Sequence, residues 1–184
     1  MPRKWQKYGK VRGITLSKER FQFIFDHEHD LMEVLEKGVH TYKDWALAID
    51  RWVEKPLEDY LQFILIWVQI RNLPMNYYTK EAIAALGEKI RQVKVVAFDL
   101  DKPQIHDYVR IQVRFDVSRP SRKSKVVNLP DGGSSVVYFN YERIQKRCYE
   151  CQRLNHEKEV CPLVIKKRRD TASERGERII KENQ

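Results

Sequence analysis

Tyr108-Val-Arg-Ile-Gln-Val-Arg-Phe-Asp-Val117 is the stretch of this chain with the clearest structural pattern. Apolar residues fill every second position from Val109 to Val117, and polar or aromatic residues fill the others. Because successive side chains of a strand point to opposite faces, this alternation predicts a β-strand with one face in a core. Arg110, Gln112 and Arg114 then share the other face, which is either a candidate groove floor for nucleic acid or an ordinary surface.

The sequence on either side predicts further strands and two helices. Strands are expected at residues 11–16, 20–25, 45–53, 61–70, 94–100 and 136–141, and helices at residues 26–37 and 79–90. Residues 61–70 are apolar at nearly every position, which is typical of a central strand covered on both sides. Gly38 stands where a C-cap is expected, and Thr79 can cap the second helix. Short turns link most of the strands, so we expect an α+β fold with helices on one face of a largely antiparallel, ferredoxin/RRM-like sheet.

Composition and charge limit the classes of partner. The chain has 184 residues, 42% of them hydrophobic, with a formal net charge of +9. This excess suits a polyanion, either nucleic acid or an anionic membrane surface. No apolar run approaches the roughly 18 residues of a membrane helix, and the N-terminus does not resemble a signal peptide. We therefore expect an intracellular protein of the nucleus, the cytoplasm or both, without a membrane partner.

The cysteines carry the most specific motif. All three lie in Cys148-x2-Cys151-x4-His156-x4-Cys161. Zinc prefers four ligands in a tetrahedron, and so short a segment needs the metal to supply its folding free energy. The alternative is three reduced cysteines and an unrelated histidine. Because protein fills all four positions, we expect one structural Zn²⁺ and no catalytic water.

The spacing from Cys148 to Cys161 resembles the zinc knuckle of retroviral and retrotransposon Gag proteins. The preceding segment resembles a domain of unknown function that precedes such a knuckle in many plant proteins derived from LINE-type retrotransposons. This similarity spans roughly residues 5–163 and is carried by residues 21–25, 28–30, 34–35, 47–52, 66–74, 79–90, 110–115, 141–142, 148–151 and 161–162. Family members usually begin with another strand and helix, so the resemblance implies that the sheet lacks these two elements here.

Three positions depart from the family pattern. Gln152 and Asn155 stand where the family knuckle often has glycine, and Asn tolerates a left-handed conformation better than most residues. Glu157 follows the histidine, where nucleic-acid-binding knuckles usually have an apolar residue. Glu157 therefore argues against base binding more than against metal binding.

Two groups of residues are candidates for nucleic-acid binding. Tyr149 lies between the first two cysteines, where its ring could stack on an unpaired base or merely pack the knuckle. The cations around it that could meet phosphates are Arg147, Arg153 and Lys158. The second group follows the knuckle and consists of Lys166, Lys167, Arg168 and Arg169. These four cations could be a phosphate-contacting arm, a nuclear localisation signal or a solvated charge run.

No pattern argues for catalysis. The acidic and histidine residues at positions 26–30 suit the start of a surface helix, because His27 and His29 do not share a helix face. Asp99 and Asp101 alternate at a strand end before a proline, where a turn needs polar residues. The sequence contains no P-loop, no nucleophile elbow and no dinucleotide-binding fingerprint. We expect a non-enzymatic protein without a small-molecule substrate.

These observations divide the chain into an α+β domain at residues 1–141, a CCHC zinc knuckle at 142–163 and a basic, polar tail at 164–184. The main hypothesis is a Gag-like protein that binds single-stranded nucleic acid, RNA in preference to DNA, and that could self-associate. The rival hypothesis is a protein-interaction module in which the knuckle only stabilises the C-terminus. We also expect the α+β domain to keep its fold when the knuckle loses its metal.

Overall fold

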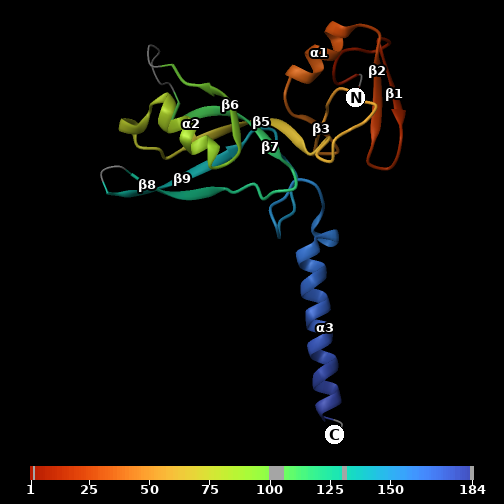
Figure 1. The fold of residues 1–184 in the computed structure, drawn as a ribbon, viewed down its shortest axis with the longest axis vertical. Coiled ribbons are helices and arrows are strands. Elements are labelled where there is room, and N and C mark those ends of the chain that lie inside the picture. The colour runs from red at the N-terminus through yellow and green to blue at the C-terminus, as the bar shows by residue number, and fades with distance from the viewer. Residues whose placement is uncertain (2, 100–105, 130–131, 183–184) are drawn as a thin grey trace.

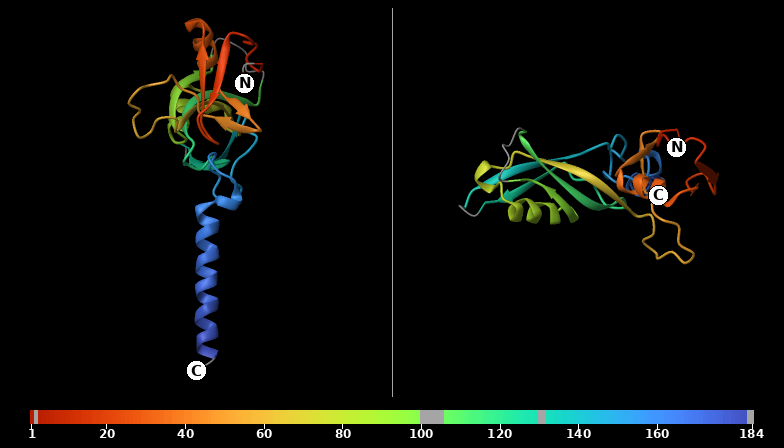
Figure 2. Two further views of the ribbon diagram at one scale, coloured as in Figure 1. Left: turned by 90° about the vertical axis from the view of Figure 1, so that its right-hand side faces the viewer. Right: turned by 90° about the horizontal axis from the view of Figure 1, so that it is seen from above.

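A computed structural model describes residues 1, 3–99, 106–129 and 132–182, of which residues 177–182 are described by their backbone alone. The fold is mixed α+β with a mostly antiparallel sheet, as predicted (Figure 1). An N-terminal pair of hairpins with helix α1 lies at one end of a five-stranded sheet, and helix α3 extends away from both (Figures 1 and 2). Within the described residues, no helix combines the length and the apolar composition that a membrane span requires.

The five-stranded sheet has the order β6-β7-β5-β9-β8, and every neighbouring pair is antiparallel. Its strands are β5 (Phe63–Arg71), β6 (Gln92–Ala97), β7 (Tyr108–Asp116), β8 (Ser124–Asn128) and β9 (Ser134–Tyr141). β5 and β7 pair along their whole length, from Phe63 with Asp116 to Arg71 with Tyr108. If β8 is left out, the strand order and the helix between β5 and β6 match the ferredoxin-like pattern. In this protein β8 stands at the place in the chain where that pattern has its second helix.

Helix α2 (Lys80–Glu88) covers one face of this sheet. The alternating apolar residues of β7 are buried beneath it, and Ile83 of α2 is fully buried among them. A Cβ atom on Gly87 would lie 2.4 Å from Val93 Cγ2, so glycine permits the close approach of the helix. The Thr79 hydroxyl caps α2, as predicted, because it accepts a hydrogen bond of 3.2 Å from the N–H of Ala82.

The opposite face of the sheet is only half-buried, so the expectation that the central strand is covered on both sides is wrong. On this face the rings of Phe63 and Trp67 lie under arginine side chains of β7 instead of under a helix. The guanidinium of Arg114 lies 3.4 Å from the centroid of Phe63, and that of Arg110 lies 4.5 Å from Trp67. Cation–π stacking therefore shields aromatic rings on the half-buried face of the sheet.

Helix α1 (Glu28–Glu36) does not cover the sheet, which corrects the expectation that both helices share one face. It packs on the hairpin of β1 (Val11–Thr15) and β2 (Phe21–Phe25), where Trp5, Val11 and Val34 form a separate core. Gly38 follows this helix with φ +80°, as expected for a C-cap. We refer to these N-terminal elements as the N-terminal unit, because they have a core of their own. The unit also contacts the sheet, since Val39, Ala46 and Ala48 pack against the core formed by residues 63–141.

Two further elements differ from the sequence-based expectation. The strand expected at residues 45–53 is limited to β4 (Trp45–Leu47), which pairs with β3 (His40–Tyr42). β8 was not among the expected strands, and it forms because β9 offers it a partner. The basic, polar tail, of which residues 164–182 are described, lies in helix α3 (Pro162–Glu182). The end of the strand expected at residues 94–100 lies outside the described residues.

Candidate metal centre and nucleic-acid interface

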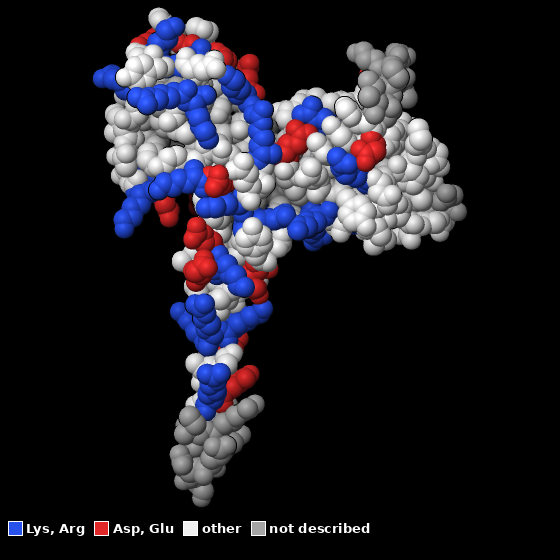
Figure 3. All heavy atoms as spheres, turned by 180° about the vertical axis from the view of Figure 1, so that it is seen from behind, with Lys and Arg blue, Asp and Glu red and all other residues white. Residues whose placement is uncertain are grey.

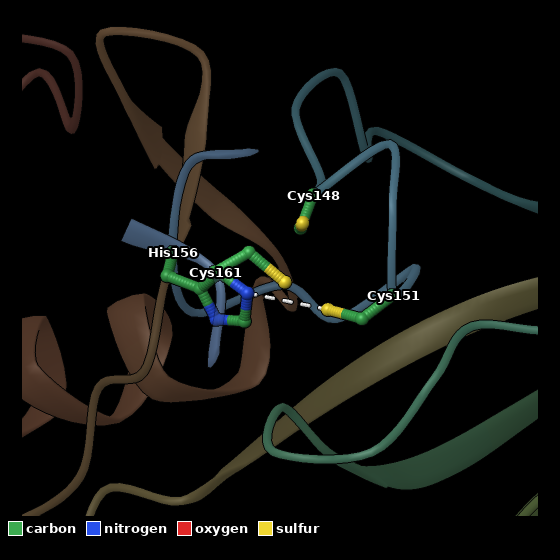
Figure 4. A group of neighbouring side chains, drawn as sticks. All are labelled: Cys148, Cys151, His156 and Cys161. Carbon is green, nitrogen blue, oxygen red and sulfur yellow. Dashed lines mark hydrogen bonds between the residues drawn. The ribbon is translucent and has the colours of Figure 1, made fainter. Parts of the chain in front are cut away.

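Four side chains converge between β9 and α3. One ligand atom from each of Cys148, Cys151, His156 and Cys161 lies within 4.8 Å of the other three, and the four side chains point toward one another (Figure 4). Cys151 Sγ and His156 Nε2 are 3.2 Å apart. Three thiols and one imidazole at this spacing form a closed tetrahedral donor set. The site fits one structural zinc ion, as the spacing predicted.

The backbone folds tightly around the first two ligands. The N–H of Cys148 donates to the carbonyl of Arg153, and the N–H of Gln152 donates to the carbonyl of Cys148, both at 2.8 Å. Gln152 adopts φ +62°, a left-handed conformation that glycine takes more easily. Asn155, which we expected to tolerate such a conformation, does not adopt a positive φ. Of the two positions where the family has glycine, only Gln152 therefore carries backbone strain.

The thiols differ in how readily they ionise. Burial raises the pKa of Cys151 to about 11. Burial also opposes ionisation of Cys161, but hydrogen bonds from the backbone of Val164 and from His156 outweigh it and lower the pKa of Cys161 to about 6. Cys161 directly precedes α3, and a helix N-terminus favours a thiolate. A bound metal ion would favour the thiolate form of all three cysteines, because its positive charge stabilises each anion.

Asn155 orients the histidine ligand, a role that the sequence analysis did not identify. Its Oδ1 lies 2.8 Å from Nδ1 of His156, while Nε2 faces the thiols. A proton on Nδ1 satisfies this contact and leaves the Nε2 lone pair free for the metal. Such outer contacts commonly fix the tautomer and the ring orientation of a ligating histidine. The sequence did offer one signal for this role, because Asn155 directly precedes the predicted ligand His156.

The knuckle is docked on the sheet. The N–H and the hydroxyl of Ser121 both donate to the carbonyl of Gln152 at 2.8 Å. The N–H of Leu154 donates to the carbonyl of Val117 at 3.2 Å, and the Leu154 side chain, 3% exposed, belongs to the core of the sheet. This packing argues against a knuckle that folds independently of the sheet.

The predicted nucleic-acid contacts fall into three groups. The ring of Tyr149 is 74% exposed, so it does not serve mainly to pack the knuckle. Lys167 binds Glu150 and thereby ties α3 to the knuckle. The remaining candidates are exposed or half-buried at the surface of the knuckle and the first turns of α3: Arg147, Arg153, Lys158, Lys166, Arg168 and Arg169.

The acidic cluster near the N-terminus is an ion-pair network. His29, Asp30 and Glu33 lie close enough together to hold a metal. The ammonium of Lys7, however, lies among them and donates to both Asp30 and Glu33. These hydrogen bonds raise the pKa of Lys7 and lower the pKa of both carboxyls. The cluster therefore anchors the start of α1, as its sequence position suggested. Asp101, the second residue of the other acidic pair, lies outside the described residues.

The arginines on the open, half-buried face of the sheet are paired with carboxylates. Arg110 binds Glu142 at 2.8 Å, Arg71 binds Asp107 at 2.8 Å, and Arg114 lies 3.9 Å from Asp59. Each guanidinium thus already has an anionic partner. This pairing favours an ordinary surface, and not a groove floor for nucleic acid, at Arg110, Gln112 and Arg114.

Comparisons with known proteins agree with the two-part organisation. Residues 1–58 match the family described as a domain of unknown function, DUF4283, and residues 115–163 match the zinc knuckle family. The chain is similar to the Uncharacterized protein At4g02000 of Arabidopsis thaliana, with 28% identity over 134 residues. That alignment covers 72% of this chain and 42% of the relative, so the chain spans less than half of the relative's length. No solved structure matches the chain.

Proposed function

We propose that this protein binds single-stranded nucleic acid, RNA in preference to DNA, through its zinc knuckle and the first turns of α3. In this proposal the protein is not an enzyme. It acts in the manner of a Gag-like retroelement protein, with the sheet as a scaffold that could also self-associate. The zinc ion holds the shape of the binding surface and takes no part in chemistry.

The exposure of Tyr149 carries the proposal. An aromatic ring that is 74% exposed between two metal ligands gains nothing from burial. Held by a rigid metal site, it offers a flat surface on which an unpaired base can stack, worth roughly 1–3 kcal/mol. Lys158, Lys166, Arg168 and Arg169 are exposed and lie close in sequence to this ring, where they can meet phosphates. Single strands suit the site better than duplexes, because stacking requires an exposed base face.

One observation favours the rival function, a structural or protein-interaction module. The side chain of Leu154 lies in the core of the sheet, so the knuckle already has a structural task without any ligand. The salt dependence of the binding affinity distinguishes the two functions. Binding driven by phosphate contacts weakens steeply as salt rises, whereas a packed protein interface depends on salt far less.

A fluorescence titration with short single-stranded RNA, repeated with DNA of the same sequence, tests the proposal. Zinc-loaded protein should bind at low salt and lose most of its affinity when a chelator is added. Tyr149→Ala should weaken binding by roughly 1–3 kcal/mol and leave the salt dependence nearly unchanged.

Tyr8→Ala is the matched control for Tyr149→Ala. Tyr8 is 75% exposed but belongs to the N-terminal unit, so its replacement should leave the affinity unchanged. Equal affinities for the wild type and Tyr149→Ala, with zinc still bound, would favour the interaction module. Equal affinities for RNA and DNA would remove the stated preference for RNA.

A further inference from the structure

Arginines around the end of β7 differ from those on the open face of the sheet. We refer to Arg91, Arg119, Arg122 and Arg147 as the junction cluster, because they come from three loops near the place where the knuckle docks on the sheet. Arg91 precedes β6, Arg119 and Arg122 lie between β7 and β8, and Arg147 directly precedes the first zinc ligand. Figure 3 shows lysine and arginine side chains gathered where the sheet meets the start of α3.

Contacts around Tyr141 bring two of these arginines, Arg91 and Arg122, together. The Tyr141 hydroxyl donates to the carbonyl of Arg122 at 2.9 Å, and its ring lies 5.6 Å from that of Phe115. The guanidinium of Arg91 lies 5.3 Å from the same Phe115 ring. Residues separated by about fifty positions in the sequence therefore surround one pair of buried aromatic rings.

Electrostatic effects agree with this placement. Burial raises the pKa of Tyr141 to about 12, while the positive charges of Arg91, Arg147 and Arg122 oppose that rise. Burial and then the charge of Arg119 lower the pKa of Arg91. The guanidinium groups are thus near enough to repel one another, so the folded protein concentrates positive charge at this point.

The charge of the junction cluster is largely uncompensated. Among the described residues, Arg91, Arg122 and Arg147 have no carboxylate within ion-pair distance, and Arg119 has one at 3.4 Å, Asp116. The Nε atom of Arg91 is buried and has no hydrogen-bond partner among these residues. Asp116 is the one carboxylate of the described residues that acts on both Arg91 and Arg119, so four guanidinium groups share little negative charge. Such an excess favours an anionic ligand, and guanidinium groups match phosphate oxygens well.

The cluster is also joined to the knuckle. Ser121 stands between Arg119 and Arg122 and is fully buried against Gln152, to whose carbonyl it donates two hydrogen bonds. Gln152 Nε2 in turn donates to the carbonyl of Tyr149 at 3.0 Å. The loop that carries the arginines is therefore connected by hydrogen bonds to the turn that carries the exposed ring.

We propose that the junction cluster binds the phosphates of the same single strand whose base stacks on Tyr149, so that the nucleic-acid site extends from the knuckle onto the sheet domain. The inference rests on the proposed function and adds Arg91, Arg119 and Arg122 to its site. An isolated knuckle would lack this part of the surface, which explains why the knuckle is docked rather than tethered.

Affinity measurements with two lengths of oligouridylate test this extension on the whole zinc-loaded protein. Oligomers of about four and about twelve nucleotides lie near the lower end and in the upper part of the site sizes of about 4–16 nucleotides that single-strand-binding OB folds show. The test variant is Arg119→Ala with Arg122→Ala, since both side chains are exposed. The control is Arg12→Ala with Arg20→Ala, which removes two exposed arginines from the β1–β2 hairpin. Circular dichroism and zinc content check that all variants are folded and loaded.

We expect the test variant to bind the longer oligomer about 3–10-fold more weakly and to lower the salt slope by up to about 1.4, that is 0.7 for each of two lost contacts. The short oligomer should be affected by Tyr149→Ala but hardly by the test variant. Equal losses in the test and control variants would overturn the inference while leaving the knuckle site intact. Equal binding of polyglutamate of matched length would also overturn it, because the cluster would then be a general polyanion surface. Failure of the wild type to bind either oligomer would overturn the proposed function itself.

Discussion

The N–H of Leu154 donates a 3.2 Å hydrogen bond to the carbonyl of Val117, which joins the zinc knuckle to the residue that follows strand β7. The side chain of Leu154 is 3% exposed and lies in the core of the sheet. The metal site and the sheet therefore share buried surface, and the stability of each depends on the other.

Zinc removal should consequently destabilise the sheet as well as the knuckle. Leu154→Ala, which removes the shared side chain, should lower the free energy of unfolding by about 2–5 kcal/mol. Urea unfolding followed by circular dichroism, with and without chelator, measures both effects. Val126→Ala is the control, because Val126 is 60% exposed on β8. An unfolding midpoint of the sheet that is indifferent to chelator would show that the two parts fold independently, as the sequence alone had suggested.

Asn155→Ala should weaken zinc binding by about 10–100-fold, the usual cost of losing an outer contact to a ligating histidine. The variant leaves all four ligands in place, so the loss reports on the orientation of His156. A competition titration with a chromophoric chelator measures the affinity. Gln152→Gly provides the comparison, because glycine relieves the positive φ at that position and should retain or improve binding. Equal losses in both variants would contradict the assigned role of Asn155.

The cations of α3 should contribute unequally to nucleic-acid binding. Replacing Lys166, Arg168 and Arg169 with alanine should reduce the salt slope by up to about 0.7 for each lost contact. Lys167→Ala should reduce it less, because Lys167 is already paired with Glu150. Binding isotherms at several salt concentrations give the slopes. A loss for Lys167→Ala as large as that of its neighbours would show that nucleic acid displaces Glu150.

Glu157→Ile should tighten binding to single-stranded RNA. The Glu157 side chain is exposed beside the histidine ligand, where a carboxylate repels phosphates and offers no apolar surface to a base. Isoleucine removes the repulsion and supplies that surface. Glu159→Ile, two positions away in the same exposed segment, is the control in the same titration. Unchanged affinity for Glu157→Ile with zinc bound would indicate that this side of the knuckle does not meet the ligand.

The N-terminal unit should lose stability as the pH falls below about 6.5, the ordinary pKa of histidine. Trp5 Nε1 donates to His40 Nδ1 at 2.9 Å, and His40 Nε2 lies 2.7 Å from the carbonyl of Val34, which requires a neutral ring. Burial lowers the pKa of His40, and the charges of Lys37 and Arg143 add to this effect. The unfolded chain therefore binds the proton more readily, and the free energy of unfolding decreases as the pH falls through this range.

Amide and indole hydrogen exchange measures this effect at Trp5, away from the zinc site. His40→Gln should flatten the pH dependence, because a side-chain amide can both accept from the indole and donate to the Val34 carbonyl. His29→Gln, at an exposed position, should leave the dependence as it is in the wild type. A wild-type protein whose Trp5 exchange is independent of pH between about 5 and 7, after correction for intrinsic exchange rates, would contradict the assigned tautomer.

The sequence alone determined the elements with a local physical cause. The strict alternation of Val109, Ile111, Val113 and Phe115 predicted a strand with one buried face, because strand geometry sends neighbouring side chains to opposite sides. Thr79 and Gly38 predicted helix ends through their own backbone chemistry. The four zinc ligands were identified because tetrahedral coordination by a short loop restricts their spacing.

Only the tertiary structure decided the features that depend on partners far apart in the chain. β8 exists because β9 pairs with it, and the half-buried face of β5 follows from the absence of a second helix within the described residues. The docking of Leu154 against Val117 and the gathering of Arg91, Arg122 and Arg147 around Tyr141 have no local signature. Burial and charge repulsion depend on distance in space, and the spacing of residues along the chain does not specify that distance until the fold has formed.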